Sequence, residues 1–290
     1  MSRTEVGAAP ASPPAGAAWF LGVPALKRAV TRILILAFGL FLLLPIWTLL
    51  LWAVTQKWLF PGVLPQEFGL RWWQWVFTNA DVGKAAYWSF TTAPTVTLLS
   101  AVICLPAAYA FARFDFPLKR LLYVSLLASN AFPKLGLYIA IAALFFRLNL
   151  IGTFWGVVFV QLVNSLVTMI WIPAAAFGAV PRELEEAARD VGARPLRVFF
   201  SVTLPIALPG IIVALILTFL GSLDEAQATL IIGTPEITTL PVEMYSLVSS
   251  YPEPVGAVFS VLLAAPSVVL LLLARRYLLS GYLAAGFKGG

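Results

Sequence analysis

The sequence predicts an all-α polytopic membrane protein with six transmembrane helices. Hydrophobic residues make up 61% of the 290 positions and charged residues only 11%, whereas soluble domains carry about 25% charged residues. The apolar residues also gather in six runs, each about long enough to cross a hydrocarbon core of ~30 Å. Lipid is therefore the expected surroundings of most of the chain.

The expected spans follow an N-terminal tail, residues 1–26, which is rich in Ala, Pro and Gly in its first 18 positions and is expected to be disordered. The first run is longer than the apolar part of a signal peptide and no small-residue cleavage site follows it, so we expect it to stay in the protein. The remainder, 27–290, is expected to form one transmembrane domain. Its spans are expected at about 31–54, 86–112, 121–146, 153–176, 206–231 and 255–275.

The distribution of basic residues predicts the orientation. With a cytoplasmic N-terminus, 14 of the 19 Lys and Arg residues fall in the tails and loops on the cytoplasmic side, as the positive-inside rule requires. The last loop on the other side, 232–254, holds three Glu and neither Lys nor Arg. Both termini are therefore expected in the cytoplasm, and the net charge of +6 needs no nucleic-acid partner to explain it.

Several function classes are disfavoured by what the sequence lacks. It has no His and one Cys, Cys104, which excludes Cys/His zinc sites and His-based catalytic triads. Neither a phosphate-binding loop nor a dinucleotide-binding glycine motif is present. We expect no bound cofactor, no metal site and no catalytic residue.

The first outside loop contains an aromatic cluster. Trp72, Trp73, Trp75 and Phe77 lie close together in "FGLRWWQWVFTN", a pattern typical of a short helix in the membrane interface. The cluster is expected either as an ordinary aromatic belt or as a surface that docks a partner outside the membrane.

A second unusual stretch is "PRELEEAARDVGARPLRVFFSVTLP", residues 181–205, which we call the charged segment. Eight of its 25 residues are charged. Pro181 suits the first turn of a helix, Gly192 suits a left-handed helix end, and Pro195 can begin a second helix. The pattern predicts a short cytoplasmic helix, a turn, and a second helix that runs into the fifth span.

The charged segment resembles the signature of permease subunits of bacterial ABC importers, E-A-A-x3-G-x9-I-x-L-P. Glu186, Ala187, Ala188, Gly192 and Leu204-Pro205 match it, and Val202 stands where Ile is usual. The resemblance extends over most of the chain after the tail, and the C-terminal "RRYLLSGYLAAGFKGG" is similar to the tail of maltose-type permeases.

The resemblance implies that the charged segment forms a coupling helix between spans 4 and 5. It would dock in a groove of a separate ATP-hydrolysing subunit, which would hold the ATP and Mg. The implied partners are a second homologous permease subunit, two ATP-binding subunits and an extracytoplasmic solute-binding protein. The residues expected to couple to the ATPase are Glu185, Glu186, Ala187, Ala188, Asp190, Gly192 and Pro205.

Ionisable residues inside spans are costly and are therefore functional candidates. Lys134 is expected near the middle of the third span and Asp224-Glu225 within the fifth. They are expected either to pair with one another or to contact solute. The other expected pathway residues are Asn130, Ser222 and Gln227, with Asn164 as a weaker candidate.

The identity of the solute stays open. Carboxylates suit a polyol or a polyamine alike, "EEAARDVGA" and "GSLDE" look more like polyamine-type permeases, and the tail and "TTLPVEMY" look more like sugar-type ones. We favour a sugar, polyol or related small solute. A gradient-driven secondary transporter is the alternative from a different class. Such transporters typically contain internal inverted repeats, and no convincing repeat is seen in this sequence.

Overall fold

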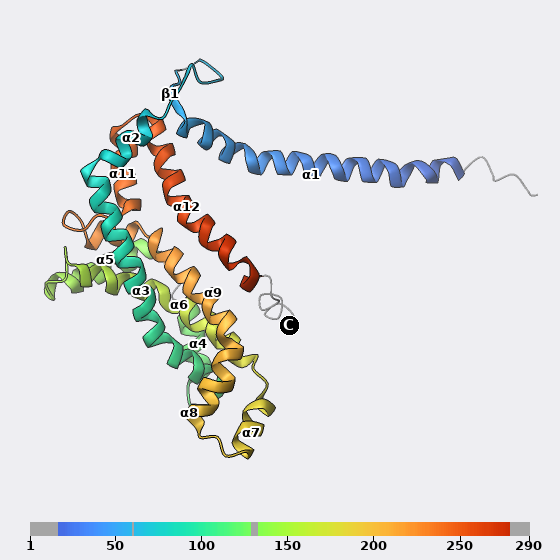
Figure 1. The fold of residues 1–290 in the computed structure, drawn as a ribbon, viewed down its shortest axis with the longest axis vertical. Helices are drawn as coiled ribbons and strands as arrows, with labels where there is room; N and C mark the ends of the chain where they lie inside the picture. Colours follow the sequence, from blue (N-terminus) through green and yellow to red (C-terminus); the bar gives the residue numbers. More distant parts are fainter. Residues whose placement is uncertain (1–16, 60, 129–132, 279–290) are drawn as a thin grey trace, which may run out of the picture. The chain divides into compact units, whose positions relative to one another are not determined.

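The computed structural model describes residues 17–59, 61–128 and 133–278 (Figure 1). The described chain is helical apart from a small two-stranded sheet, β1 antiparallel to β2. In chain order the elements are α1 (Ala17–Ala53), β1 (Thr55–Lys57), β2 (Glu67–Phe68), α2 (Arg71–Thr78), α3 (Ala80–Arg113), α4 (Lys119–Ala128), α5 (Lys134–Arg147), α6 (Phe154–Gly178), α7 (Arg182–Asp190), α8 (Pro195–Val198), the π-helix η2 (Phe199–Thr203), α9 (Leu204–Leu223), α10 (Gln227–Ile232), α11 (Leu240–Ser250) and α12 (Glu253–Leu278).

Within the described residues, five helices are long and apolar enough to cross a membrane. They are Val30–Ala53, Ala80–Arg113, Phe154–Gly178, Pro195–Leu223 and Glu253–Leu273. They correspond to the first, second, fourth, fifth and sixth spans expected from the sequence.

The chain divides into two units, 1–51 and 52–290. Most of α1 forms the first unit, and the most apolar 18 residues of its candidate span include no buried residue. Phe41 and Leu36, for example, are more than 70% exposed, so this helix presents a continuous apolar surface suited to lipid. Helix α1 begins at Ala17, so the expected disordered tail overlaps it by ten residues; residues 1–16 lie outside the described part.

The core of the second unit lies where α3, α6 and α9 pack together (Figure 1). Small residues make the contact: Cys104 and Ala108 from α3, Ala174 and Ala176 from α6, and Ala207 from α9 are all buried. A Cβ on Gly210 would lie 2.5 Å from the Cβ of Ala176. Small side chains let the backbones of membrane helices approach closely, so these three helices form a rigid frame.

The third expected span, 121–146, is two helices instead of one. Helix α4 ends at Ala128 and α5 begins at Lys134, with Pro133 as its N-terminal cap. Proline has no backbone N–H and disfavours helical geometry in the residue before it. Lys134 therefore stands at the start of a helix, where the sequence had placed it near the middle of a span.

The fifth expected span, 206–231, also differs. It begins earlier, because α8, η2 and α9 run on as one helix from Pro195, and it ends at Leu223. Asp224 caps α9, donating its backbone N–H to the carbonyl of Leu220 at 3.0 Å. The acidic pair therefore lies in the break between α9 and α10, not inside a continuous helix.

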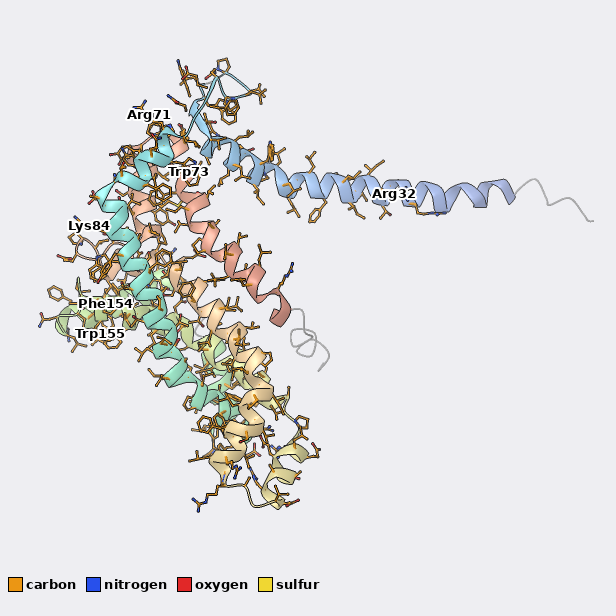
Figure 2. All side chains as sticks on the ribbon, viewed as in Figure 1. Arg32, Arg71, Trp73, Lys84, Phe154 and Trp155 are labelled. Carbon is orange, nitrogen blue, oxygen red and sulfur yellow. The ribbon has the colours of Figure 1, made fainter. Side chains whose placement is uncertain are left out.

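The aromatic cluster forms α2, as expected (Figure 2). Its side chains contact the rest of the second unit: Trp73 Nε1 donates to the carbonyl of Ala53 at 2.7 Å, the ring of Trp75 lies 4.6 Å from that of Tyr251, and Val76 is fully buried. Trp73, Trp75 and Val76 therefore pack against the rest of the second unit, while Phe77 remains 68% exposed.

Candidate functional site

A polar cavity of about 220 Å³ lies between the start of α5, the middle of α6 and the second half of α9. Most of its lining side chains are uncharged and polar. They are Gln161, Asn164, Ser165 and Thr168 from α6, and Thr218 and Ser222 from α9, with Lys134 and Glu225 as the charged members. Polar groups inside a membrane-spanning frame are costly unless they serve function or are fully paired.

Glu225 is held by three hydrogen bonds from three parts of the chain. Its Oε2 accepts from Asn164 Nδ2 at 3.1 Å and from the Tyr138 hydroxyl at 3.3 Å. Its Oε1 accepts from the backbone N–H of Ala228 at 2.9 Å, which satisfies one of the free donors at the start of α10. The carboxylate thus ties α5, α6 and α10 together at the edge of the cavity.

A second buried network lies beside it. The Ser222 hydroxyl donates to Gln161 Oε1, and Gln161 Nε2 donates to the Thr229 hydroxyl at 2.9 Å. All three side chains are less than 10% exposed. The amide of Gln161 is therefore fixed between α9 and α10.

Thr218 differs from these residues because its hydroxyl has no hydrogen-bond partner in the described chain, although the residue is only 3% exposed. An unpaired buried hydroxyl is costly. Thr218 lines the cavity, so its hydroxyl is free to form a hydrogen bond with a molecule placed there.

The structure brings together four of the expected pathway residues: Lys134, Ser222, Glu225 and the weaker candidate Asn164 all line the cavity. Asp224 and Gln227 are exposed and are not in its lining. Asn130 lies outside the described residues. Within the described chain Lys134 forms no ion pair with Asp224 or Glu225.

Sequence reasoning missed Gln161, Ser165, Thr168 and Thr218. Their spacing indicated this: 161, 164, 165 and 168 follow one face of a helix, and 218 and 222 lie on one face of the next span. Among the described residues no group of three His, Cys, Asp or Glu is placed to hold a metal ion.

The charged segment forms the short helix, turn and second helix that the sequence predicts. Gly192 has φ +84°, and its N–H bonds to the carbonyl of Arg189 at 2.8 Å. The N–H of Ala193 bonds to the carbonyl of Ala188 at 3.1 Å. These two bonds form a Schellman motif, which ends α7 and requires the left-handed residue. Pro181 caps the helix rather than occupying its first turn.

Glu185 is turned into the protein. It is 6% exposed, its Oε1 lies 2.9 Å from Arg113 Nη2, and the same oxygen accepts from the Thr203 hydroxyl at 2.6 Å. Arg113 Nη2 also donates to the carbonyl of Val180 at 2.9 Å. Glu185, one of the residues expected to couple to the ATPase, is therefore buried in this chain, where it fixes α7 to the end of α3 and to η2.

The rest of α7 faces outward. Glu186, Ala187 and Asp190 are exposed and Ala188 is partly buried. Leu184 is 48% exposed and Val191 86% exposed. Pro205 is exposed on the first turn of α9. A short rigid helix with slim alanines and uncovered apolar side chains is suited to contact another protein.

The frame of apolar helices, the polar cavity inside it and the projecting α7 define a membrane transport protein. The model of the binding-protein-dependent transport system inner membrane component matches residues 102–283. The chain belongs to this family, whose members are permease subunits of ABC importers, so ATP hydrolysis resides on a separate subunit.

Two curated relatives are the sulfoquinovosyl glycerol transport system permease protein SmoH of Agrobacterium fabrum, 29% identical over 73% of this chain and 76% of its own, and the maltose/maltodextrin transport system permease protein MalG of Photorhabdus laumondii, 33% identical over 78% and 75%. A solved bacterial alginate ABC transporter, in complex with an alginate pentasaccharide-bound periplasmic protein, has a chain that matches with a TM-score of 0.65 over 88% of this chain and 94% of its own, at 14% identity. That likeness shows the fold.

Proposed function

We propose that this permease subunit takes up a sugar, polyol or related small solute by alternating access. The observation that carries the proposal is the polar cavity, because hydroxyl and amide groups dominate its lining. Such groups donate and accept in pairs, as the hydroxyls of a sugar require. The two relatives are named for carbohydrate-containing solutes, which supports the same class.

A polyamine fits the cavity less well. Glu225, the only carboxylate among the described residues of its lining, already accepts three hydrogen bonds. Lys134 lines the same cavity and would repel a cationic solute. A neutral solute, or one with a single anionic group, meets neither difficulty.

The coupling helix in this proposal is α7, which would dock in a groove of the ATPase. Its exposed residues Glu186, Ala187 and Asp190, with Gly192 in the turn after it, would meet that subunit. The buried pair of Glu185 with Arg113 would pass its movement to α3, and the unbroken helix from Pro195 to Leu223 would pass it to α9. ATP and Mg would stay on the partner.

The assembly would contain a second homologous permease, two ATP-binding subunits and a solute-binding protein outside the membrane. Both termini would be cytoplasmic, as the charge distribution predicts. Helices α4 and α5 would together make the third of six crossings, with Lys134 at the start of its second helix. Interrupted helices at membrane depth occur where they line a cavity, which is where Lys134 lies.

Co-purification and uptake test the proposal. The full chain is expressed with the proteins encoded beside it and purified through a tag on this subunit. Candidate sugars, polyols and polyamines are first tested for binding to the binding protein, and uptake is then measured in proteoliposomes. We expect an ATPase and a second permease to co-purify and a sugar or polyol to be taken up only with ATP. Purification without an ATPase, or uptake of polyamines alone, would overturn the proposal.

A further inference from the structure

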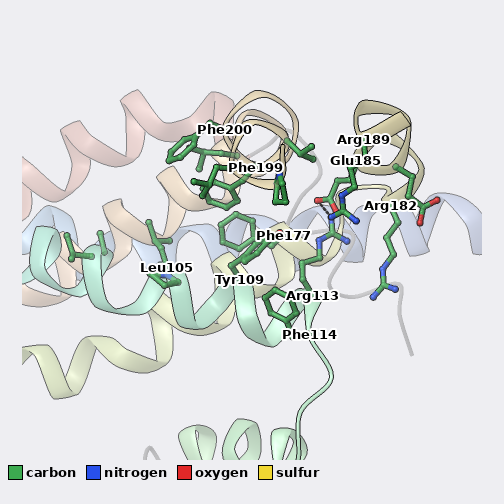
Figure 3. A pocket seen from close by; sticks show the side chains of 18 residues that line it. Leu105, Tyr109, Arg113, Phe114, Phe177, Arg182, Glu185, Arg189, Phe199 and Phe200 are labelled. Atoms are coloured by element: carbon green, nitrogen blue, oxygen red, sulfur yellow. Dashed lines mark hydrogen bonds and ion pairs between the residues drawn. The ribbon is translucent and has the colours of Figure 1, made fainter. Parts of the chain in front are cut away.

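A second, larger cavity of about 1030 Å³ opens beside α7 (Figure 3). Its walls are the last turns of α3, the end of α6, and the helix that runs from α8 through η2 into α9. It is separate from the polar cavity, with which it shares no lining residue. Its volume is at the upper end of the usual range for a ligand site.

One end of this cavity is apolar and rigid. The ring of Tyr109 lies edge-on to Phe177 at 5.4 Å and to Phe199 at 5.1 Å. Leu105 and Phe200 extend this surface along the membrane spans (Figure 3). Val102 and Phe200 are 72% and 63% exposed. Because α3 and the helix from Pro195 to Leu223 are both candidate spans, this end lies along the candidate spans and is uncovered in this chain.

The other end is basic. Arg182 and Arg189 of α7 line it (Figure 3), both are exposed, and neither forms an ion pair with any described residue. Glu185 is neutralised by Arg113, and Glu186 is the other carboxylate in the lining. The two free guanidinium groups therefore exceed the one free carboxylate by a single positive charge. Arg113 Nε, which is buried at this end, also has no hydrogen-bond acceptor among the residues that the structure describes.

We propose that this cavity binds an anionic phospholipid. Its acyl chain would lie along Leu105, the three rings and Phe200, and its phosphate would meet Arg182 and Arg189. Basic pockets between transmembrane helices near the membrane surface are suited to anionic headgroups, and the single excess charge matches one phosphodiester. The site does not depend on which solute the protein carries.

Photolabelling with lipids tests the site. The full chain, purified with its partner subunits, is reconstituted in vesicles of phosphatidylcholine that contain a trace of phosphatidylglycerol with a photoreactive acyl chain. Labelled positions are mapped by mass spectrometry, and unlabelled phosphatidylglycerol or phosphatidylcholine is added as competitor. We expect labels within 101–114 and 195–204, displaced by phosphatidylglycerol and not by phosphatidylcholine.

Variants separate the site from general attraction to a charged surface. Arg182→Gln with Arg189→Gln removes two charges that line the cavity, and Arg194→Gln with Arg197→Gln removes two from the same segment that do not line it. At about 1 kcal/mol for each basic residue near the surface, the first pair is expected to weaken phosphatidylglycerol binding by about 30-fold. The second pair is expected to change it far less. Leu105→Trp, which fills the apolar end, is expected to reduce labelling without a change of charge.

Three outcomes would overturn the proposal: equal competition by the two lipids, equal losses in the two arginine variants, or labels elsewhere in the chain. A partner protein seated in the cavity would appear as the absence of label from the assembled transporter together with label in the isolated chain. Uptake and labelling are measured separately. Wild-type uptake by Leu105→Trp would show that the transport function is intact, and the lipid site is then judged from the labelling alone.

Discussion

Arg113 Nη2 lies 2.9 Å from Glu185 Oε1, and both side chains are 7% exposed. The contact joins the end of α3 to a helix 72 residues further along the chain. Thr203 bonds the same carboxylate oxygen from η2. One buried carboxylate therefore connects three elements: the end of one candidate span, the start of another, and the helix between them that projects outward.

Removing one partner of this pair is expected to destabilise the protein strongly. Arg113→Met or Glu185→Met leaves an uncompensated buried charge, which typically costs about 3–5 kcal/mol. The double variant, Arg113→Met with Glu185→Met, is expected to regain much of the loss, because two apolar groups replace two charges. Thermal unfolding of the purified chain in detergent measures this.

An exposed ion pair near the same end of α3 serves as the control. Lys119 and Asp115 lie 3.2 Å apart, with Asp115 97% exposed, and exposed pairs contribute little. Lys119→Met is therefore expected to leave the melting temperature nearly unchanged. If it shifts the melting temperature as far as Arg113→Met does, the special role of the buried pair is refuted.

Gly192→Asp is expected to abolish uptake while the protein still inserts in the membrane. A side chain there is strained, because φ is +84°, and it would project into the surface proposed to meet the ATPase. A Cβ at Gly192 has no described atom within 4 Å, so no clash within the chain explains a loss. Gly178→Ala, also without a neighbour within 4 Å and without positive φ, is the control. Wild-type uptake by Gly192→Asp would argue against docking at this turn.

Thr218→Val is expected to raise the KM for solute without lowering stability. Valine keeps the shape of the side chain and removes a hydroxyl that has no partner in the described chain. A lost hydrogen bond to solute of about 1 kcal/mol corresponds to about a fivefold rise in KM. Thr203→Val, whose hydroxyl bonds Glu185, is expected to show the reverse pattern, a lower melting temperature. An unchanged KM for Thr218→Val would remove Thr218 from the proposed pathway.

Glu243 in α11 gives a prediction about pH. Partial burial, and to a smaller extent the negative charge of Asp81, raises the pKa of its carboxyl above the ordinary 4.5. The folded protein therefore holds this proton more tightly than the unfolded chain, and the charged form destabilises the fold above that raised pKa. Glu243→Gln is expected to raise the melting temperature at neutral pH, by an amount that shrinks as the pH falls toward 4.5. Glu253→Gln, at an exposed position on α12, controls for the loss of one charge; a gain that is constant with pH would contradict the prediction.

Local features were predictable from the sequence for a physical reason. Gly192 and Pro195 act on their own backbone, so the end of α7 and the start of the next helix follow from residue type alone. Five of the six spans expected from the apolar runs are candidate spans in the described chain, because a long hydrophobic run indicates a lipid environment. The signature from Glu186 to Pro205 named the family that the match over 102–283 shows.

Only the tertiary structure decided which polar side chains meet. Hydropathy does not specify which helices pack together, so the sequence could not pair Arg113 with Glu185, or set Gln161 and Thr218 around one cavity with Lys134. It also placed Asp224 and Glu225 together, whereas the break after Leu223 turns Glu225 to Asn164 and leaves Asp224 exposed. Each of these outcomes depends on contacts between helices that are distant in the sequence. Those contacts depend in turn on the close approach of α3, α6 and α9, which their small side chains permit.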